Sequence, residues 1–504
     1  MKYSNHGHLY RSVSFFLFFI LLGCSNDSLE DDILYGSFDS DDIAISLEGE
    51  LQISDFVWKG LNEFYYWQED VTELSDEKLI DQKAYGQYIN ENPVAETFFN
   101  SLKHPDDRFS WIQDDYRILE NSLQGIIASN GVEFGLLYAC ESCNELVGFV
   151  KYILEGSDAE NKNIKRGDFF LGVNGNILTT SNYRSLLYSD KLNYTLNMAS
   201  TDSGVLALNG IEVNLTKEEN FEINPIQVSN IIPFDGGING YLGNVGYLMY
   251  NQFVADKSDD LNEVFANFKT EGISDLIIDL RYNGGGSVQN CVELASMITG
   301  QFTSEIFAEE QWNNKLLTYL RERFGKETLI NRFVSQLSNG NQINSLNLNR
   351  VFILTTSESA SASELLINGL DSYIDVIQVG ERTVGKNVGS ITVYDYVDNE
   401  QTKNPDHTYA MQPIVLKIAN SEGFADYSDG LIPDTEIEED IKNLGVLGDS
   451  NEQLLKSVLD IITGSGKRNI PKAEMSRALL IKDPLMLQRQ KMIIEKKELQ
   501  SILK

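Results

Sequence analysis

Residues 275–287 read DLIIDLRYNGGGS, an apolar run that ends in a polar, glycine-rich stretch. The run DLIIDL has the length and composition of a buried strand, and the three consecutive glycines that follow cannot continue it. The next stretch, VQNCVELASMI (288–298), has the apolar spacing of a helix. The segment therefore predicts a strand, a tight loop and a helix in succession, which is typical of an α/β fold.

Two later segments repeat this order of apolar strand and polar loop. The first is RVFILTT (350–356), which runs into the serine-rich SESASASE (357–364). The second is DVIQVG (375–380), which runs into ERTVGKNVGS (381–390). Between them, ELLINGL (364–370) has a helical pattern. Ligands of open α/β sheets bind beside the carboxyl ends of the strands, so we expect the three loops to share one site.

The overall composition excludes one class of partner. The chain has 504 residues, 42% of them hydrophobic, which is enough for more than one packed core. Its 40 Lys and Arg against 75 Asp and Glu give a formal net charge of -35 at pH 7. Because such a chain repels phosphate groups, we do not expect it to bind nucleic acid.

The N-terminus has the pattern of an export signal. Lys2 and Arg11 precede the apolar run VSFFLFFILL (13–22). As a helix, this run would cross only about half of a bilayer core, so it predicts a signal peptide and not a membrane span. The stretch LLGC, which ends at Cys24, resembles a bacterial lipobox. This resemblance implies that residues 1–23 are removed and that Cys24 carries a lipid, although an ordinary cleavage nearby is the alternative.

The segment that follows Cys24 predicts where the protein is held. Residues 24–49 are polar and acidic and have the composition of a solvated tether. Their acidic run resembles the surface-export signals of some Gram-negative lipoproteins. We therefore expect a lipid-anchored protein of the outer membrane, on its periplasmic or its cell-surface face.

Two cysteines lie close together in CESC, at Cys140 and Cys143. They could form half of a zinc site, but neither a second pair nor a nearby histidine completes four ligands, so we expect no metal. A redox pair would need a helix N-terminus, whereas the flanking stretches VEFGLLYA and ELVGFVKYIL have the pattern of strands. The favoured interpretation is a disulfide that closes a hairpin in an oxidising compartment.

Ser361, in the middle of the serine-rich stretch, has two possible roles. With Glu364 it fits the S-x-x-E capping box, in which it would only begin a helix. As a nucleophile it would need a neighbouring base. Outside the predicted signal peptide the histidines are His104 and His407, and neither lies in a motif. Lys386, after the next strand, could serve if burial lowered its pKa, so a Ser/Lys pair is the consistent chemistry.

Lys386 also belongs to a competing pattern. GERTVGKN (380–387) matches the phosphate-binding pattern G-x-x-x-x-G-K-[ST] except at Asn387, which lacks the hydroxyl that binds magnesium. We disfavour a nucleotide site because the chain carries an export signal and because its acidity repels polyphosphate.

These motifs together resemble the carboxy-terminal processing peptidases, also called tail-specific or S41 peptidases, over about residues 50–460. The matching stretches are GVEFG (131–135) and GSDAENKNIKRGDFFLGVNG (156–175) for a PDZ domain, LIIDLRYNGGG (276–286), SASASE (359–364) and TVGK (383–386) for the core, and DGLIPD (429–434) near its end.

The resemblance implies an α/β peptidase core, ClpP/crotonase-like, with an inserted PDZ-like, mostly-β domain and an N-terminal helical region. The domains expected are a signal peptide (1–23), an acidic tether (24–49), an N-terminal helical domain (50–125), a PDZ-like domain (126–215), the S41 peptidase core (216–445) and a C-terminal helical tail (446–504).

The resemblance also implies roles for residues of the core. Ser361 would be the nucleophile and Lys386 the base, and the oxyanion hole would use the backbone N–H of Ala362 and of Gly284 or Gly285. Some members have a glutamine four residues after the lysine, where this chain has Ser390, so a third catalytic member is in doubt. The expected reaction is hydrolysis of peptide bonds through an acyl-enzyme, without a cofactor.

The PDZ-like region would select the substrate. The loop and strand formed by Val132, Glu133, Phe134 and Gly135 could cap the terminal carboxylate of a peptide while the strand edge pairs with the preceding residues. We therefore expect exported peptides or proteins, cleaved near their C-termini, as substrates. The alternative is a catalytically inactive, PDZ-type peptide-binding lipoprotein.

Overall fold

The computed structural model describes residues 47–202, 205–398, 400–466 and 480–494. The predicted signal peptide, Cys24 and most of the predicted tether lie outside these ranges. In the ranges described, no helix is both long enough and apolar enough to cross a membrane.

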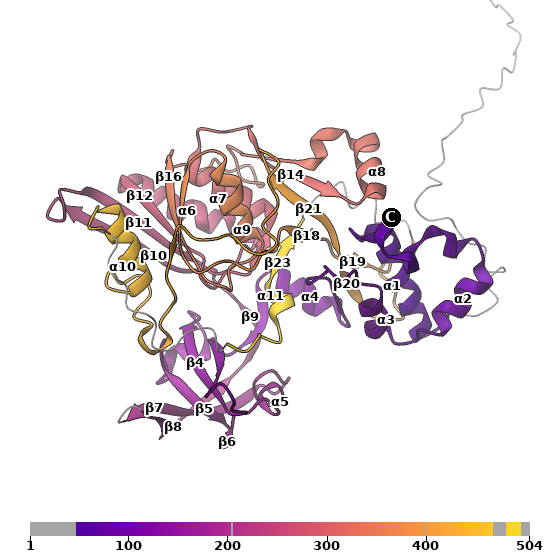
Figure 1. Cartoon of the computed structure of the whole chain (residues 1–504), viewed down its shortest axis with the longest axis horizontal. Helices are drawn as coiled ribbons and strands as arrows, with labels where there is room; N and C mark the ends of the chain where they lie inside the picture. Colours follow the sequence, from indigo (N-terminus) through magenta and orange to yellow (C-terminus); the bar gives the residue numbers. More distant parts are fainter. Residues whose placement is uncertain (1–46, 203–204, 399, 467–479, 495–504) are drawn as a thin grey trace, which may run out of the picture. The chain divides into compact units, whose positions relative to one another are not determined.

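The central sheet has six strands in the order β10-β11-β12-β16-β17-β22. Figure 1 labels β10, β11, β12 and β16 of this sheet. Their bounds are β10 (Ile226–Asp235), β11 (Leu242–Tyr250), β12 (Ile273–Asp279), β16 (Arg350–Thr355), β17 (Asp375–Gly380) and β22 (Thr435–Glu436). All neighbours are parallel except β10, which pairs antiparallel with β11. The three predicted strands are β12, β16 and β17, and they lie side by side with their carboxyl ends together. The expected α/β core is therefore confirmed.

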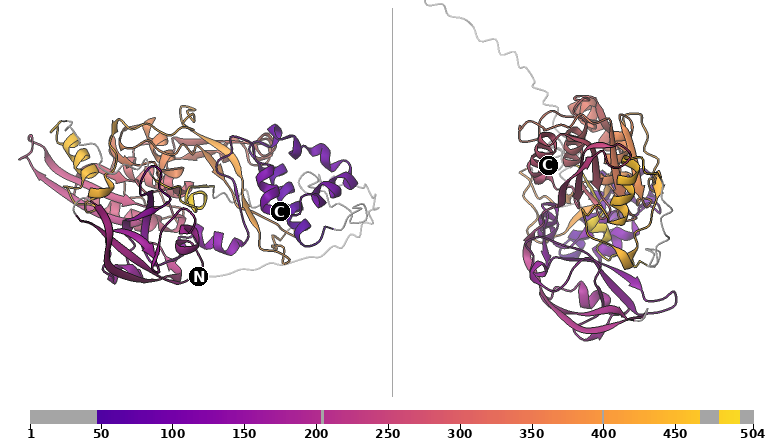
Figure 2. Two further views of the ribbon diagram at one scale, coloured as in Figure 1. Left: turned by 60° about the horizontal axis from the view of Figure 1, so that its bottom comes forward. Right: turned by 90° about the vertical axis from the view of Figure 1, so that its left-hand side faces the viewer.

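Helices cover both faces of this sheet (Figures 1 and 2). They are α6 (Ser258–Thr270), α7 (Val288–Thr299), α9 (Ala362–Asp371) and α10 (Gln453–Ile462). Ile277, Phe352 and Val379 are buried together with Leu454 and Val458 of α10. Alternate residues of the same strands are also buried, beneath α6, α7 and α9. Burial on both faces explains why the strands are continuous apolar runs in the sequence.

A second six-stranded sheet lies beside the carboxyl ends of the first, in the order β13-β23-β18-β21-β14-β15. Its strands are β13 (Gly285–Ser287), β23 (Lys491–Ile493), β18 (Val388–Ser390), β21 (Ile414–Asn420), β14 (Ile306–Trp312) and β15 (Ile330–Arg332). Helix α8 (Asn314–Phe324) follows β14. The short strands β13 and β18 come from the glycine-rich loop and the lysine loop.

The C-terminal region differs from the helical tail expected over 446–504. Helix α10 is present, but the last part described contains only the one-turn helix α11 (Met486–Arg489) before it becomes the strand β23. The strand forms because Lys491, Met492 and Ile493 find open strand edges in β13 and β18. Tertiary pairing overrides the helical propensity of this stretch.

The region before the core consists mainly of helices. It contains α1 (Glu50–Phe64), α2 (Gln82–Asn90), α3 (Ala95–Ser101) and α4 (Tyr116–Leu123). A short strand, β1 (Trp111–Gln113), pairs with β20 (Ala410–Gln412), which also pairs with β19 (Val393–Tyr394). Trp58 and Leu61 of α1 are fully buried.

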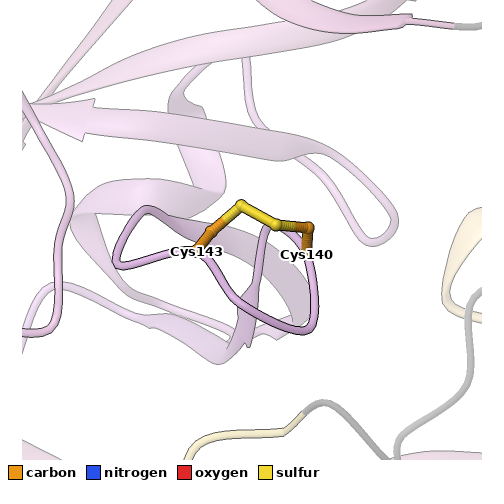
Figure 3. The surroundings of a disulfide bond; sticks show 2 residues. All are labelled: Cys140 and Cys143. Carbon is orange, nitrogen blue, oxygen red and sulfur yellow. A yellow bond between two sulfur atoms is a disulfide. The ribbon is translucent and has the colours of Figure 1, made fainter.

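Residues 126–222 form the mostly-β region inserted before the core. The sheet order is β3-β4-β5-β7-β8, with β6 beside β5, and β2 pairs with β9. The bounds are β2 (Ile126–Ser129), β3 (Val132–Tyr138), β4 (Leu146–Ile153), β5 (Phe169–Val173), β6 (Asn176–Ile177), α5 (Tyr183–Leu187), β7 (Asn193–Asp202), β8 (Val205–Thr216) and β9 (Glu218–Glu222). A disulfide joins Cys140 and Cys143 in the turn between β3 and β4 (Figure 3).

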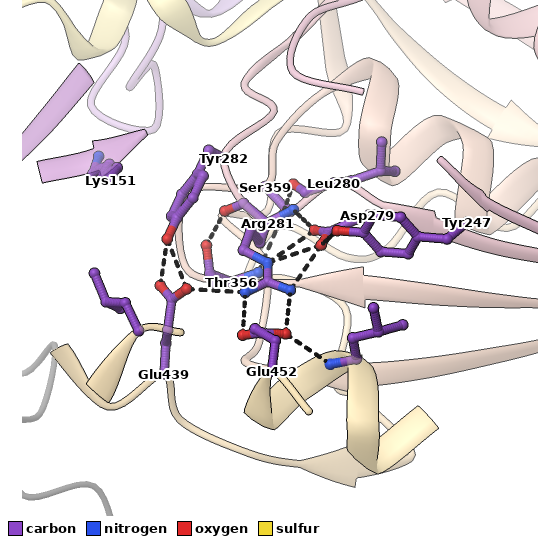
Figure 4. A network of polar contacts seen from close by, with 12 residues as sticks. Lys151, Tyr247, Asp279, Leu280, Arg281, Tyr282, Thr356, Ser359, Glu439 and Glu452 are labelled. Carbon is purple, nitrogen blue, oxygen red and sulfur yellow. Dashed lines mark hydrogen bonds and ion pairs between the residues drawn. The ribbon is translucent and has the colours of Figure 1, made fainter. Parts of the chain in front are cut away.

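A buried ionic network joins the inserted region to the core (Figure 4). Arg281, which is fully buried, pairs with Asp279, Glu439 and Glu452 at 2.7, 3.1 and 2.8 Å. Arg166 of the inserted region reaches the same Glu439 at 2.7 Å. Breaking a buried pair of this kind typically costs about 3–5 kcal/mol, so the network fixes the base of the loop that carries the three glycines.

Candidate active site

The loops that follow β12, β16 and β17 meet through backbone hydrogen bonds. The N–H of Ala360 donates to the carbonyl of Asn283 at 3.1 Å, and the N–H of Val384 donates to the carbonyl of Ser359 at 3.0 Å. The glycine loop, the serine loop and the lysine loop therefore form one assembly at the carboxyl ends of the central strands, as the sequence predicted.

The serines of SESASASE differ in what their hydroxyls do. Ser359 donates to the carbonyl of Leu280 at 2.7 Å, and Ser363 donates to the carbonyl of Asn283 at 2.9 Å. The hydroxyl of Ser361 between them is buried and has no hydrogen-bond partner among the residues described. The flanking serines thus hold the loop, while the middle one keeps its hydroxyl available.

Ser361 has an unusual backbone conformation at the start of α9. Its φ is 64° and its ψ is -114°, a region that non-glycine residues rarely occupy and that costs about 1–3 kcal/mol. Ser361 and Glu364 have the arrangement of a capping box, and the N–H of Ser361 donates to the Glu364 carboxylate at 2.7 Å. The hydroxyl of Ser361 nevertheless completes no hydrogen bond in the described structure, so capping does not account for it.

The carboxylate of Glu364 connects the serine loop to the lysine loop. One oxygen, Oε2, accepts from the N–H of both Ser361 and Lys386, at 2.7 and 2.8 Å. The other oxygen accepts from the N–H of Gly385 at 2.6 Å and from the hydroxyl of Thr383 at 2.5 Å. Burial raises the pKa of Glu364, although these hydrogen bonds oppose the rise. Glu364 therefore holds the two loops at a fixed spacing.

Lys386 is buried, with 2% of its surface exposed. Its pKa is lowered from the ordinary value of 10.5 to about 7, chiefly because burial removes the charged ammonium from water and also because of the nearby charge of Lys491. The carboxylates of Asp107 and Glu364 act in the opposite direction. The Nζ of Lys386 donates to the carbonyl of Gln490 at 2.6 Å. Near neutral pH, a large fraction of this amine is uncharged and able to accept a proton.

The surroundings of Lys386 include residues that the sequence did not single out. Its Nζ lies 5.2 Å from the centre of the Phe109 ring. Asp107 accepts from the hydroxyl of Tyr65 at 2.7 Å, and Arg108 donates to the carbonyl of Gly385 at 2.8 Å. The stretch HPDDRFSWI is visible in the sequence, but nothing in its spacing connects it to a lysine so far along the chain.

Gly285 lies against the candidate nucleophile. Its φ is 104°, and a Cβ added to it would come within 2.7 Å of Ser361 Cβ and 2.9 Å of the backbone nitrogen of Ala362. Position 285 therefore requires glycine, because its positive φ disfavours other residues and because a Cβ would clash with Ser361 and Ala362. The N–H of Gly285 donates to Asn283 Oδ1 at 2.8 Å and so already has a partner. At Gly284, a Cβ would meet the carbonyl oxygen of Arg489 at 2.4 Å.

Other predicted residues lie elsewhere. Ser390 lies on β18, where its hydroxyl donates to the carbonyl of Met492 at 3.4 Å. The two histidines each face an aspartate, His104 with Asp106 at 3.8 Å and His407 with Asp395 at 3.0 Å. In the part of the chain that is described, no group of three or more His, Cys, Asp or Glu could hold a metal ion.

The residues predicted to bind a peptide carboxylate begin β3, in the inserted region. Val132 donates its N–H to Asn130 Oδ1 at 3.1 Å, so that amide already has a partner. The Glu133 carboxylate accepts from Arg489 at 2.7 Å. Phe134 and Gly135 follow in the same strand, which forms an edge of its sheet.

The chain matches two family models. Residues 244–415 match Peptidase family S41, and residues 52–111 match the Peptidase S41 N-terminal domain. Among curated proteins, it is 27% identical over 253 residues to the Carboxyl-terminal-processing peptidase 3, chloroplastic, of Arabidopsis thaliana, covering 47% of this chain and 43% of the relative. It is 25% identical over 196 residues to a Probable CtpA-like serine protease of Staphylococcus epidermidis, covering 39% of this chain and 34% of the relative. The chain thus spans less than half the length of these two relatives.

A solved structure shares the fold. A Bacteroides fragilis protein assigned to the S41 proteases aligns with a TM-score of 0.62 and 24% identity, covering 82% of this chain and 97% of that one. The glycine, serine and lysine loops lie inside the residues that match Peptidase family S41. By these matches, the chain contains a peptidase domain of family S41 at residues 244–415 and the family's N-terminal domain at residues 52–111.

Proposed function

We propose that the protein is a serine endopeptidase in which Ser361 is the nucleophile and Lys386 the general base. The observation that carries this proposal is the state of Lys386, which is buried beside the serine loop with its pKa lowered to about 7. A base must be uncharged at the working pH, and an exposed lysine is not. The free hydroxyl of Ser361 at the start of a helix supports the same proposal.

The proposed reaction proceeds through an acyl-enzyme. Neutral Lys386 takes the proton of the Ser361 hydroxyl as its oxygen attacks the peptide carbonyl, and the resulting ammonium then protonates the leaving amine. Water hydrolyses the ester in a second step, again with lysine as the base. The negative oxygen of each tetrahedral intermediate lies near the N-terminus of α9, where the N–H of Ala362 and a glycine N–H from the NGGG loop would stabilise it.

The proposed substrates are peptides or proteins cleaved near their C-termini. The resemblance to tail-specific peptidases supports this class, and the edge strand β3 offers a surface for strand addition. In that role Val132, Glu133, Phe134 and Gly135 would contact the end of the peptide, although Glu133 is itself an acid and now pairs with Arg489.

The proposed location is the outer membrane, through a lipid on Cys24. The sequence around Cys24 supports this placement. Wild-type protein should fractionate with membranes, whereas Cys24→Ser should give an unprocessed or soluble form. An unchanged membrane fraction, with no difference in mass, would contradict lipidation.

Three variants test the catalytic assignment in a fluorogenic peptide assay. Ser361→Ala and Lys386→Ala should each abolish hydrolysis, and the double variant should be no worse, because the two residues act as a unit. Lys386→Arg should fail as well, since guanidinium does not lose its proton near neutral pH. Ser357→Ala removes an exposed hydroxyl from the same stretch and is the matched control, with activity unchanged.

A serine-reactive phosphonate separates this function from an inactive, peptide-binding protein. The peptidase should be labelled at Ser361 and lose activity in proportion to the labelling. A protein that binds peptides but neither reacts nor cleaves would contradict the proposal.

A further inference from the structure

The described C-terminal segment, residues 480–494, enters the candidate active site. Its strand β23 lies between β13 of the glycine loop and β18 of the lysine loop; Figure 1 labels β23 and β18. Gly285 pairs with Lys491 in parallel, and Ser390 pairs with Ile493. The chain's own tail therefore adds a strand between the two loops that carry the candidate oxyanion glycine and the candidate base.

The contacts of this strand centre on the candidate catalytic residues. Lys386 donates to the carbonyl of Gln490 at 2.6 Å. A Cβ on Gly285 would lie 2.2 Å from the carbonyl oxygen of Lys491 and 2.7 Å from Ser361 Cβ. The tail carbonyl and Ser361 therefore both pack against Gly285. Two successive peptide carbonyls of the tail thus lie beside the candidate base and beside the glycine loop next to Ser361.

The same segment contacts the edge strand of the inserted region. The N–H of Ile481 donates to the carbonyl of Leu136 at 2.9 Å, and Leu480 forms an antiparallel bridge with Leu137. This is strand addition to the open edge of β3. Closer to β23, Arg489 pairs with Glu133 at 2.7 Å. One peptide therefore occupies the edge of β3 and the candidate catalytic loops together.

The side chains of the strand are held in the site. Met492 is fully buried and Lys491 is 6% exposed. The Nζ of Lys491 donates to the hydroxyl of Ser122 at 2.5 Å and borders a cavity of 260 Å³. Glu120 and Asp256 also line this cavity, and Glu120 pairs with Lys403 at 2.5 Å. Burial and the charge of Arg489 lower the pKa of Lys491 to about 7. Residues 467–504 carry ten Lys or Arg and four Asp or Glu, in a chain of net charge -35.

We propose that residues 480–494 are an intramolecular peptide ligand that occupies the peptide-binding cleft of the same chain and competes with other peptides for it. The arrangement blocks catalysis, because the Nζ of Lys386 is bonded to the tail carbonyl and not to the Ser361 hydroxyl. Other peptides would bind by replacing β23, extended and parallel to β13. That these peptides are also cleaved rests on the proposed function; their binding does not.

The test weakens the tail in the full-length chain and measures peptide binding. Arg489→Glu replaces an attractive pair with Glu133 by two facing carboxylates, and Met492→Asp places a charge in a buried position. Lys482→Glu makes the same change of charge as Arg489→Glu at an exposed residue of the segment and is the control. All three are made in the Ser361→Ala background, so that binding is measured without turnover.

The probe is a fluorescent synthetic peptide of residues 480–494 with the native sequence, followed by fluorescence anisotropy. A tethered ligand competes at an effective concentration on the order of 1 mM, so a peptide whose own Kd is about 0.1 mM should bind about tenfold more tightly once the tail is displaced. Arg489→Glu and Met492→Asp should both show this gain, and Lys482→Glu should bind like the native tail.

Hydrolysis is measured in chains that keep Ser361, and it separates the proposal that the tail is a peptide ligand from the proposal that the protein is a peptidase. If both hold, Arg489→Glu lowers KM for an unrelated peptide by a similar factor and leaves kcat unchanged. If the peptidase assignment fails, no variant hydrolyses peptide, yet binding still responds to Arg489→Glu. Equal peptide binding by the native, Arg489→Glu and Met492→Asp chains would show that β23 is a permanent strand of the fold and would overturn the inference.

Discussion

Replacing Lys386 by methionine should change how the stability of the protein depends on pH. Methionine matches the length of the lysine stem but carries no charge. In the folded protein burial lowers the pKa of Lys386 from 10.5 to about 7, whereas the unfolded chain keeps the ordinary value. At any pH below the pKa of Lys386 in the unfolded chain, folding must either remove a proton from this amine or bury its charge, and both cost free energy.

The size of the effect follows from this difference in pKa. Going from 10.5 to about 7 corresponds to about 5 kcal/mol, at about 1.36 kcal/mol per pH unit. The destabilisation is fully present below about pH 7 and disappears as the pH rises toward 10.5. Between about pH 6.5 and about pH 9, the wild type should gain about 2–3 kcal/mol of unfolding free energy relative to Lys386→Met.

The test uses only the part of the difference in unfolding free energy that changes with pH. Lys386→Met also leaves the buried carbonyl of Gln490 without its donor, which costs about 1–3 kcal/mol but does not depend on pH. Urea unfolding of wild type and variant at the two pH values cancels that constant. The same substitution at exposed Lys482 controls for the loss of one positive charge. A difference between wild type and Lys386→Met that stays constant across this range would refute a lowered lysine pKa and, with it, the proposed base.

Further predictions concern activity and the inserted region. The kcat/KM for peptide hydrolysis should rise with pH through about 7 as Lys386 loses its proton, and a profile that falls over this range would contradict a neutral lysine base. Gly285→Ala should reduce hydrolysis at least tenfold, since its Cβ would lie 2.7 Å from Ser361 Cβ; steady-state rates that match wild type would show that the loop is not part of the site. Replacing Cys140 and Cys143 by serine should lower the unfolding free energy by at most about 2 kcal/mol, because the disulfide closes a very short loop; calorimetry showing a much larger loss would mean that the turn organises the sheet.

The central sheet could be predicted from the sequence because its strands are buried on both faces and are therefore continuous apolar runs. The runs at 275–280, 350–356 and 375–380 are continuous and apolar, and each ends in glycine or small polar residues that can only form a loop. Their order along the chain, with helices between, leaves a parallel sheet as the simple solution, and a parallel sheet brings the three loops to one edge. This topology, together with the lack of a histidine in a motif, led to the hypothesis that Lys386 activates Ser361.

The remaining features depend on contacts between residues far apart in the chain. Asp107 and Phe109 reach Lys386 through tertiary packing that no local pattern records. The tail was predicted to be helical from its composition, yet Lys491 to Ile493 form a strand because unpaired edges of β13 and β18 are available to them. The amide of Gly284 or of Gly285 was expected to bind an oxyanion, whereas the Gly285 amide donates to Asn283 in this structure.

The central claim is that Ser361 is a nucleophile activated by Lys386. It is tested most directly by reacting the full-length protein with a fluorophosphonate and locating the adduct by intact mass and peptide mapping. A tail-weakened chain carrying Arg489→Glu should react faster, at a single site. The account predicts one adduct, on Ser361, whose formation slows by at least a hundredfold in a folded Lys386→Ala variant. Labelling at another residue, or labelling of Ser361 at the same rate without Lys386, would contradict it.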